Sequence, residues 1–310
     1  MAGYISKAGH DVTVYNRTKT KADKWVKEYK GKNANTPMDA AKDCDFVFTC
    51  VGNDNDLEEV TIGKQGIYNT IKKGAIHIDN TTASAEIARE LYKKAGDFGL
   101  LGMGYPEKYG GTFEGIDIFH GIVTSEELAQ GSGGIAASLL SLNISLPLIL
   151  ALGTEEQKEK YITPVIAGDK IACLGVTEPS GGSDVAGIKT KAVRDGSDYI
   201  LNGSKMFITS GMRADYYVIA CRTGGPGTSG ISAILVEKGT PGFTQTPLKK
   251  MGWLASDTAV LYFDDCRVPA ENLIGGENSG WAGIMSNFSQ ERLGLAAGMN
   301  AYSQISVSYT

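Results

Sequence analysis

The sequence predicts a multidomain protein of the α/β plus α+β class, because its apolar pattern changes character three times. Residues 1–95 alternate short apolar runs with amphipathic segments, the pattern of a parallel sheet with connecting helices. Residues 96–172 show helical spacing only. Residues 173–275 hold short strand-like runs separated by turns, which favours a small antiparallel β-barrel. Residues 276–310 begin a further helical part, and these four ranges are the expected domains.

The apolar periodicity places individual elements in the first two parts. Strands are expected at residues 12–15, 46–51 and 75–79, and helices at residues 18–30, 64–73, 84–94, 117–130, 134–152 and 155–167. Thr154 and Gln157 fit a capping box at the start of the last helix. Ser, Asn and Pro residues interrupt the apolar segment 134–152, which is therefore expected to be a buried helix pair rather than a membrane span.

The third part has the spacing of a small all-β domain. Strands are expected at residues 188–193, 199–209, 216–221, 231–236 and 259–263. Asp195-Gly196 and Asn202-Gly203 lie between apolar runs, and such pairs are strong signals of tight hairpin turns. A final helix is expected from about residue 279 to the end.

Composition narrows the classes of function. The 310 residues carry a formal net charge of −5, which argues against a general nucleic-acid-binding protein. Five scattered cysteines and three distant histidines show no metal-ligand spacing. The cysteines are scattered and odd in number, and the start of the chain has no apolar core of the signal-peptide type. Both features favour the cytoplasm.

Two motifs point to a flat, phosphate-bearing ligand. Residues 177–184 read TEPSGGSD, and they combine hydroxyls with glycines that let backbone N–H groups approach a ligand. Residues 205–211 read KMFITSG and end a strand-like run on an aromatic and two hydroxyls. Together they predict a site for a hydrogen-bonding cofactor.

With these motifs, residues 98–305 resemble the acyl-CoA dehydrogenase family. Residues 104–111 (GYPEKYGG), 152–158 (LGTEEQK), 251–253 (MGW) and 268–273 (VPAENL) follow that family's order and spacing. The resemblance covers about two-thirds of the chain. It implies an FAD-dependent oxidoreductase that removes hydrogen from the α and β carbons of an acyl-CoA thioester.

The resemblance also implies which residues contact FAD. They are Leu174, Val176, Thr177, Gly182, Ser183, Phe207, Ile208 and Thr209. In the family pattern, the residue at Thr177 bonds the pyrimidine edge of the flavin. Phe207 takes the place of an aromatic that packs on the flavin, and Thr209 donates to N5, the atom that receives hydride.

The reaction needs a base for the proton α to the thioester carbonyl. A minority of the family, including isovaleryl-CoA dehydrogenase, place this base in a Glu-Arg pair on the helix after the barrel. Glu291 and Arg292 match that pair, so the resemblance makes Glu291 the candidate base and places Arg292 beside the thioester. The alternative, that Glu291 is a solvated helix carboxylate, stays open.

Residues 1–95 resemble the NAD(P)-binding domain of the 3-hydroxyisobutyrate dehydrogenase family, as an incomplete Rossmann-like sheet. Residues 8–18 match its second strand, and Asn16, Arg17 and Thr18 would hold the 2′-phosphate of NADP. Residues 50–54 and 79–84 match two of its cofactor-side loops. The family's first strand and Gly-rich loop have no counterpart here, so Arg17 as a solvated cation is the competing interpretation.

Three hypotheses follow. The leading one is an acyl-CoA dehydrogenase-type flavoprotein that uses an electron-transfer flavoprotein or a similar acceptor and forms homo-oligomers. The family's first two helices and most of its C-terminal helical domain have no counterpart here, which leaves loss of activity open. The alternatives are a fragment of an NADP-dependent hydroxyacid dehydrogenase and a non-catalytic fusion of two gene fragments.

Overall fold

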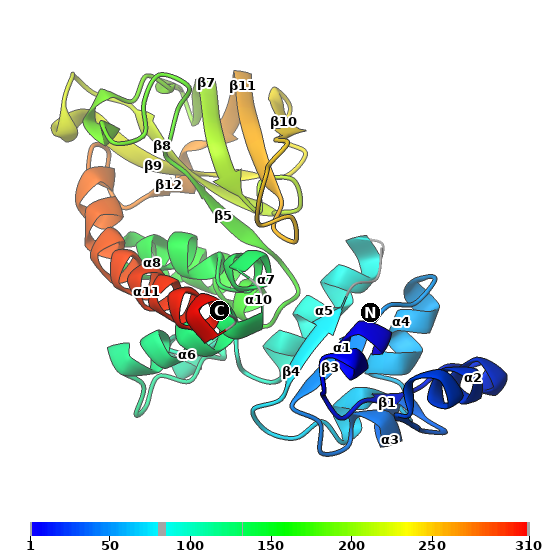
Figure 1. Ribbon diagram of the computed structural model, residues 1–310. Coiled ribbons are helices and arrows are strands. Elements are labelled where there is room, and N and C mark those ends of the chain that lie inside the picture. Colours follow the sequence, from blue (N-terminus) through cyan, green and yellow to red (C-terminus); the bar gives the residue numbers. More distant parts are fainter. Residues whose placement is uncertain (1, 80–84, 132, 309–310) are drawn as a thin grey trace. The chain divides into compact units, whose positions relative to one another are not determined.

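The computed structural model describes residues 2–79, 85–131 and 133–308 (Figure 1). The chain divides into two compact units, residues 1–90 and 91–310, and each is described by itself. Both helices and strands occur in each unit, so the expected mixed class of fold is confirmed.

In its described residues, the first unit contains short helices and four strands. In chain order they are α1 (Ala2–Lys7), β1 (Thr13–Val14), α2 (Lys19–Tyr29), β2 (Lys32–Asn33), α3 (Pro37–Ala41), β3 (Phe46–Thr49), α4 (Asp54–Thr61), the 3₁₀ helix η1 (Ile67–Asn69), β4 (Ile76–Asp79) and the start of α5 (Ala85–Asp97). The strands form two separate parallel pairs, β1 with β2 and β3 with β4. In the part of the unit that is described, no strand joins the two pairs.

The helix expected at residues 64–73 is wrong. The structure has only the 3₁₀ turn η1 there. Gly66, just before it, has an extended backbone with φ −75° and ψ 160°, and Gly74 has a positive φ of 86°. The extended backbone at Gly66 and the left-handed backbone at Gly74, which glycine adopts at little steric cost, leave room for only a short turn despite the apolar spacing.

The second unit begins with helices. They are the end of α5, η2 (Glu107–Tyr109), α6 (Ile118–Gly131), α7 (Gly133–Leu139), α8 (Leu142–Leu152), α9 (Glu155–Tyr161) and α10 (Thr163–Ile166). The predicted capping box is confirmed, since Thr154 and Gln157 exchange hydrogen bonds at the start of α9. The Gln157 side chain also donates to the carbonyls of Glu271 and Leu273, at 2.7 and 2.9 Å, and so ties α9 to the end of the sheet.

The apolar segment at residues 133–152 forms the expected helix pair, α7 and α8. Among the described helices it is the one long and apolar enough to cross a membrane. Leu142, Leu146 and Ile149 of α8 are fully buried in the hydrophobic core, which also includes residues of the sheet. The packing of α8 therefore matches that of a core helix.

An eight-stranded sheet forms the rest of the unit. Its strands are β5 (Ala172–Gly175), β6 (Lys191–Asp195), β7 (Asp198–Thr209), β8 (Tyr216–Arg222), β9 (Ile231–Glu237), β10 (Phe243–Pro247), β11 (Thr258–Pro269) and β12 (Leu273–Ile274), with 3₁₀ turns η3 (Val185–Gly187), η4 (Thr228–Gly230) and η5 (Ala270–Asn272). The order is β10-β11-β7-β6-β8-β9-β12, and β5 pairs with β8 in parallel. The sheet and the helices form separate layers (Figure 1).

The turn expected at Asn202-Gly203 is wrong, whereas the turn after Asp195 is present. Asp195 pairs with Asp198 across a two-residue hairpin, but Asn202 and Gly203 lie inside β7. A Cβ atom at Gly203 would lie 2.7 Å from the Cα of Thr190. This glycine therefore serves a close approach of two chain segments and not a reversal of direction.

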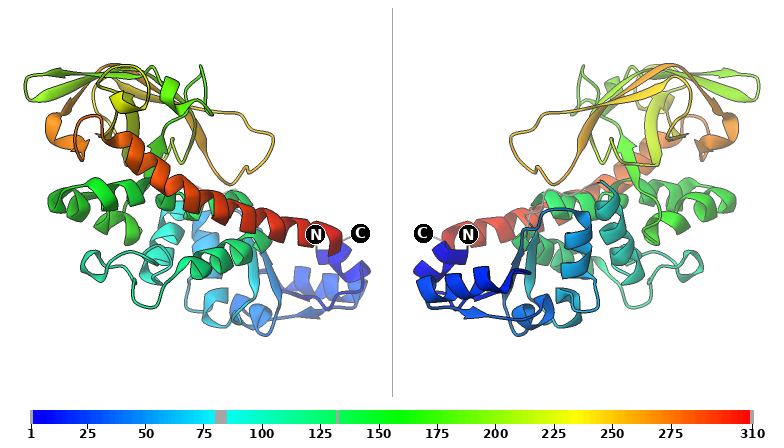
Figure 2. Two further views of the ribbon diagram at one scale, coloured as in Figure 1. Left: turned by 90° about the vertical axis from the view of Figure 1, so that its left-hand side faces the viewer. Right: turned by 90° about the vertical axis from the view of Figure 1, so that its right-hand side faces the viewer.

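A long helix, α11 (Gly280–Ser308), follows the sheet. It packs against β9 at its start and against α8 and α6 further along, and Figure 2 shows it running from the sheet along those helices. The helix that carries Glu291 is thus fixed to both layers of the unit.

A hydrogen-bonded chain of four side chains links β3 and β4 in the first unit. Thr49 Oγ1 donates to Asp79 Oδ1 at 2.6 Å, since an ionised carboxylate only accepts. The Thr49 oxygen then accepts from His77 Nε2 at 2.9 Å, which leaves Nδ1 to accept from the Tyr68 hydroxyl at 2.9 Å. The chain thus fits a neutral His77, and burial lowers the pKa of its imidazole.

The first prediction concerns this histidine. Its pKa is lower in the folded unit than in the unfolded chain, where it is about 6.5. The unfolded chain therefore binds more protons as the pH falls below that value, and the first unit loses stability there. Hydrogen exchange of peptides containing β3 and β4, corrected for intrinsic rates, is expected to accelerate between about pH 7.5 and about pH 5.5.

His77→Gln should remove this acceleration, whereas the same substitution at exposed His10 should leave it in place. Equal pH dependence in the wild type and in His77→Gln would contradict the assignment.

Candidate functional site

The two sequence motifs meet where β5 ends beside β7. Thr177 lies just after β5, and its carbonyl accepts a hydrogen bond of 2.8 Å from the N–H of Met206 in β7. This backbone bond places Thr177, in the first motif, next to Phe207, in the second. The structure therefore brings together the two groups of residues that the sequence predicted to share a ligand.

The first motif folds as a tight turn. The backbones of Glu178 and Gly181 exchange two hydrogen bonds of 3.0 Å across Pro179 and Ser180. Gly182 and Ser183 follow on the surface. A Cβ atom at Gly182 would lie 3.2 Å from Cγ2 and 3.5 Å from Oγ1 of Thr177, so glycine keeps space beside that hydroxyl.

Phe207 has an unusual backbone and an unusual exposure. Its φ is 62°, in the left-handed region that bulky residues rarely adopt, and 64% of its surface is exposed. Because most of the Phe207 side chain is exposed, its packing adds little to the stability of the fold. Packing therefore does not explain the strained backbone. Strained residues of this kind cluster where ligands bind.

The side chains around Phe207 differ in exposure. Thr209 is partly exposed and pairs with Thr258 of β11, whereas Ile208 is buried in the core and supports the strand from behind. Leu174 and Thr177 are also partly exposed, and Val176 is 7% exposed. The polar members of the predicted set thus keep access to the surface.

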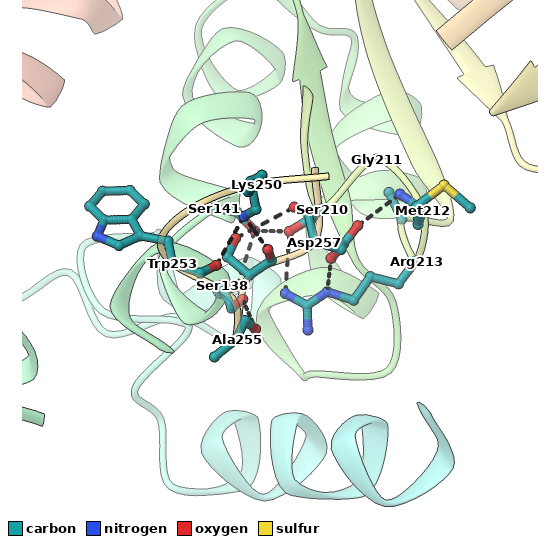
Figure 3. Close-up of polar contacts among 12 residues, drawn as sticks. Ser138, Ser141, Ser210, Gly211, Met212, Arg213, Lys250, Trp253, Ala255 and Asp257 are labelled. Atoms are coloured by element: carbon teal, nitrogen blue, oxygen red, sulfur yellow. Dashed lines mark hydrogen bonds and ion pairs between the residues drawn. The ribbon is translucent and has the colours of Figure 1, made fainter. Parts of the chain in front are cut away.

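Ser210 and Asp257 fix the end of β7 (Figure 3). Ser210 has a φ of 61°, donates its N–H to the carbonyl of Asp257 at 3.0 Å, and bonds through its hydroxyl to Ser141 at 3.0 Å. The Asp257 carboxylate accepts from Arg213 Nε at 2.6 Å and from the N–H of Met212 at 2.8 Å. Hydrogen bonds to Asp257 and Ser141 therefore hold the segment that follows Thr209.

A buried ion pair lies under both motifs. Lys205 Nζ lies 2.8 Å from Oε1 of Glu178, and the two side chains are 0% and 4% exposed. The Glu178 carboxylate also accepts from the N–H groups of Lys189 and Thr190, at 2.7 and 2.9 Å. Burial alone would raise the pKa of the Glu178 carboxyl, but Lys205 and these hydrogen bonds hold the pKa below its usual range.

Glu178 and Lys205 belong to the two motifs, but the sequence alone assigned them no role. The signal for Lys205 lies in the period of β7. Tyr199 and Leu201 point into the core, and the same alternation points Lys205 inward. A lysine at such a position requires a buried partner.

Glu291 and Arg292 lie on α11. The Glu291 side chain is half-buried, and burial raises the pKa of its carboxyl while the adjacent Arg292 opposes this. The Arg292 guanidinium lies 5.8 Å from the ring centre of Phe288. Within the described residues, no hydrogen bond or ion pair links Glu291 to β7.

The residues expected to hold NADP lie in the first unit. Asn16 accepts from the N–H of Thr18 at 2.9 Å, and Arg17 forms a 2.5 Å ion pair with Asp56. The Asp56 carboxylate uses one nitrogen of a guanidinium that is otherwise exposed, so binding of a 2′-phosphate by Arg17 stays a prediction. The hydroxyl-rich loop at residues 80–84 lies outside the described residues.

Three family models match the chain. The N-terminal domain of acyl-CoA dehydrogenases matches residues 68–169, and their middle domain matches residues 173–266. The NAD binding domain of 6-phosphogluconate dehydrogenase matches residues 1–110, so two of the matches overlap between residues 68 and 110.

Individual relatives agree with these matches. The mitochondrial isovaleryl-CoA dehydrogenase of Pongo abelii is 40% identical over 72% of this chain and 53% of its own length. The structure of butyryl-CoA dehydrogenase from Megasphaera elsdenii has a TM-score of 0.66 and 38% identity over 71% of this chain and 58% of its own. A structure of the electron transferring flavoprotein of Acidaminococcus fermentans matches with a TM-score of 0.66 and 41% identity, over 70% and 57%. This chain thus spans between half and two-thirds of each relative.

The second prediction tests the strain at Phe207. Glycine tolerates a positive φ that costs an alanine about 1 kcal/mol. The free energy of unfolding of Phe207→Gly is therefore expected to exceed that of Phe207→Ala by about 1 kcal/mol. Urea denaturation should show this as a higher unfolding midpoint for the glycine variant.

Tyr262 is the matched control, because it is an exposed aromatic within β11 and has no positive φ. There the order should reverse, since glycine within a strand is less stable than alanine. A Phe207→Ala variant as stable as Phe207→Gly would show that no strain is stored.

Proposed function

Because this chain carries acyl-CoA dehydrogenase N-terminal and middle domains behind an NAD-binding domain of the 6-phosphogluconate dehydrogenase type, we propose that its second unit binds FAD and oxidises an acyl-CoA thioester. The observation that carries the proposal is Phe207, an exposed aromatic held in a left-handed conformation beside the Thr177 turn. The relatives include isovaleryl- and butyryl-CoA dehydrogenases, so the substrate is proposed only as an acyl-CoA.

The residues of the two motifs fit an FAD molecule. The space that Gly182 keeps beside Thr177 suits a ligand that bonds the hydroxyl, and the N–H groups of Gly182 and Ser183 suit a pyrophosphate. Phe207 would pack on the flavin with Leu174 and Val176 nearby, and Thr209 would donate its hydroxyl to N5. When bound, FAD would supply the acceptor for the hydride that leaves the β carbon.

Glu291 is proposed as the base that takes the proton from the α carbon. Its half-buried position supports this role over that of a solvated helix carboxylate, and burial raises its pKa, which brings a carboxylate closer to the operating pH. Arg292, next to it in sequence, would bind near the thioester and favour the charged form of the base.

A hollow beside the site offers a place for the phosphates of CoA. It has a volume of about 490 Å³ and is lined by Lys189, Arg222 and the glycine-rich segment 224–227, among others. The N–H of Lys189 bonds Glu178, so the hollow adjoins the first motif. The exposed Lys189 supplies a positive charge there.

The partners are proposed from the relatives and from exposed apolar side chains. An electron-transfer flavoprotein or a similar acceptor is proposed from the resemblance to the acyl-CoA dehydrogenases. Leu293, Leu295 and Met299 on α11 are exposed by 43–49% of their surface, which supports self-association. The five cysteines are free thiols, in keeping with the cytoplasm.

The third prediction tests cofactor binding. The purified chain, mixed with excess FAD and then freed of unbound cofactor, is expected to keep a flavin absorption spectrum. Phe207→Ala should bind more weakly, because the aromatic surface for the flavin is lost. A chain that stays colourless after this treatment would contradict the proposal.

The fourth prediction concerns Glu291. With FAD bound, reduction of the flavin by an acyl-CoA in a single turnover should accelerate as the pH rises through the pKa of Glu291. This pKa lies above the ordinary carboxyl value of about 4.3. Glu291→Gln should abolish the reduction and leave the oxidised flavin spectrum unchanged, whereas Glu159→Gln, at an exposed position of α9, should leave the reduction normal. Undiminished reduction by Glu291→Gln would remove Glu291 as the base.

A further inference from the structure

Glu178 and Lys205 form an ion pair at buried positions that two apolar side chains could occupy instead. Lys205 is fully buried, on the face of β7 that also carries the buried Tyr199 and Leu201, and it pairs with Leu261 of β11. Buried ion pairs contribute little to the stability of a fold, because the free energy lost when two charges leave water is about as large as the free energy gained from their attraction. Proteins therefore often tolerate apolar residues in place of such a pair. The contacts of this pair indicate what else it does.

The lysine holds both residues that flank Thr177. Its Nζ donates to the carbonyl of Val176 at 3.0 Å and pairs with the carboxylate of Glu178 at 2.8 Å. Its stem passes the end of β5, since a Cβ atom at Gly175 would lie 3.3 Å from Cγ of Lys205. One ammonium group therefore fixes the chain immediately before and after the Thr177 hydroxyl.

The same lysine begins the second motif. The N–H of the next residue, Met206, donates to Thr177, and the strained Phe207 follows. The displacement of Lys205 would therefore move the backbone that carries Phe207. On the other side, the Glu178 carboxylate holds the N–H groups of Lys189 and Thr190, which lie between η3 and β6.

We propose that Glu178 and Lys205 are a positioning pair that holds Thr177 and Phe207 in their ligand-binding conformation before the cofactor arrives. The inference rests on the proposed binding of FAD. It adds that the site is preorganised by this ion pair and is not shaped by the ligand.

Neutral variants separate positioning from stability. Glu178→Gln and Lys205→Met each leave one buried charge unpaired, so both are expected to lower the unfolding midpoint. The double variant contains no unpaired charge and should recover most of that loss. It still lacks the bond from Lys205 to the Val176 carbonyl, so the two motifs stay loosened. Arg267→Met, which breaks the exposed pairs with Asp195 and Asp198, is the control.

Three readouts are taken on each variant. Hydrogen exchange without FAD, on peptides covering residues 176–184 and 205–211, should be faster in the double variant than in the wild type and in Arg267→Met. With FAD, the dissociation constant should rise roughly tenfold, as happens when contacts that orient binding groups are lost. The visible circular dichroism of the bound flavin should also change.

A double variant with wild-type exchange in both peptides would overturn the proposal, as would one with wild-type FAD affinity and flavin dichroism. If the wild type binds no FAD, the proposed function fails, and exchange without FAD still decides whether the pair positions the motifs. If the neutral variants do not fold, Glu178→Asp replaces them. It keeps the charge but withdraws the carboxylate by one methylene, so faster exchange of both peptides is expected and unchanged exchange overturns the proposal.

Discussion

The ion pair between Glu178 and Lys205 is the constraint on which the rest of the site depends. It joins the chain just after β5 to the middle of β7, where the N–H of Met206 also donates to the carbonyl of Thr177. A buried charge pair requires all its hydrogen bonds, because each unpaired group is costly in the core. The positions of Val176, Glu178 and Lys205 are therefore tightly coupled.

This constraint explains how the fold tolerates strain at the surface. Phe207 and Ser210 both have left-handed backbones within four residues, and neither is a glycine. Lys205 anchors the chain before them, and the bonds of Ser210 and Arg213 to Asp257 anchor it after them. Such strain persists only where the surroundings fix the backbone. The exposed face between the two anchors is then available to a ligand.

Much of this fold is visible in the sequence where the signals are local. The capping box at Thr154 was predicted because both partners lie within one helical turn. Asn202-Gly203 misled because a glycine that permits close packing against Thr190 looks the same in sequence as one in a turn. The sequence also predicts that the two motifs share a ligand, but it does not indicate the ion pair between them, because the partner of Lys205 lies 27 residues away and no local pattern specifies such a contact.

The most direct test of the central claim is a crystal structure of the chain with FAD bound, compared with one of the chain alone. We predict the same left-handed φ at Phe207 and the same contact between Glu178 and Lys205 in both structures. We also predict the flavin against Phe207, with N5 within hydrogen-bonding distance of the Thr209 hydroxyl. A flavin bound elsewhere, or a Phe207 that becomes left-handed only in the complex, would contradict a preorganised site.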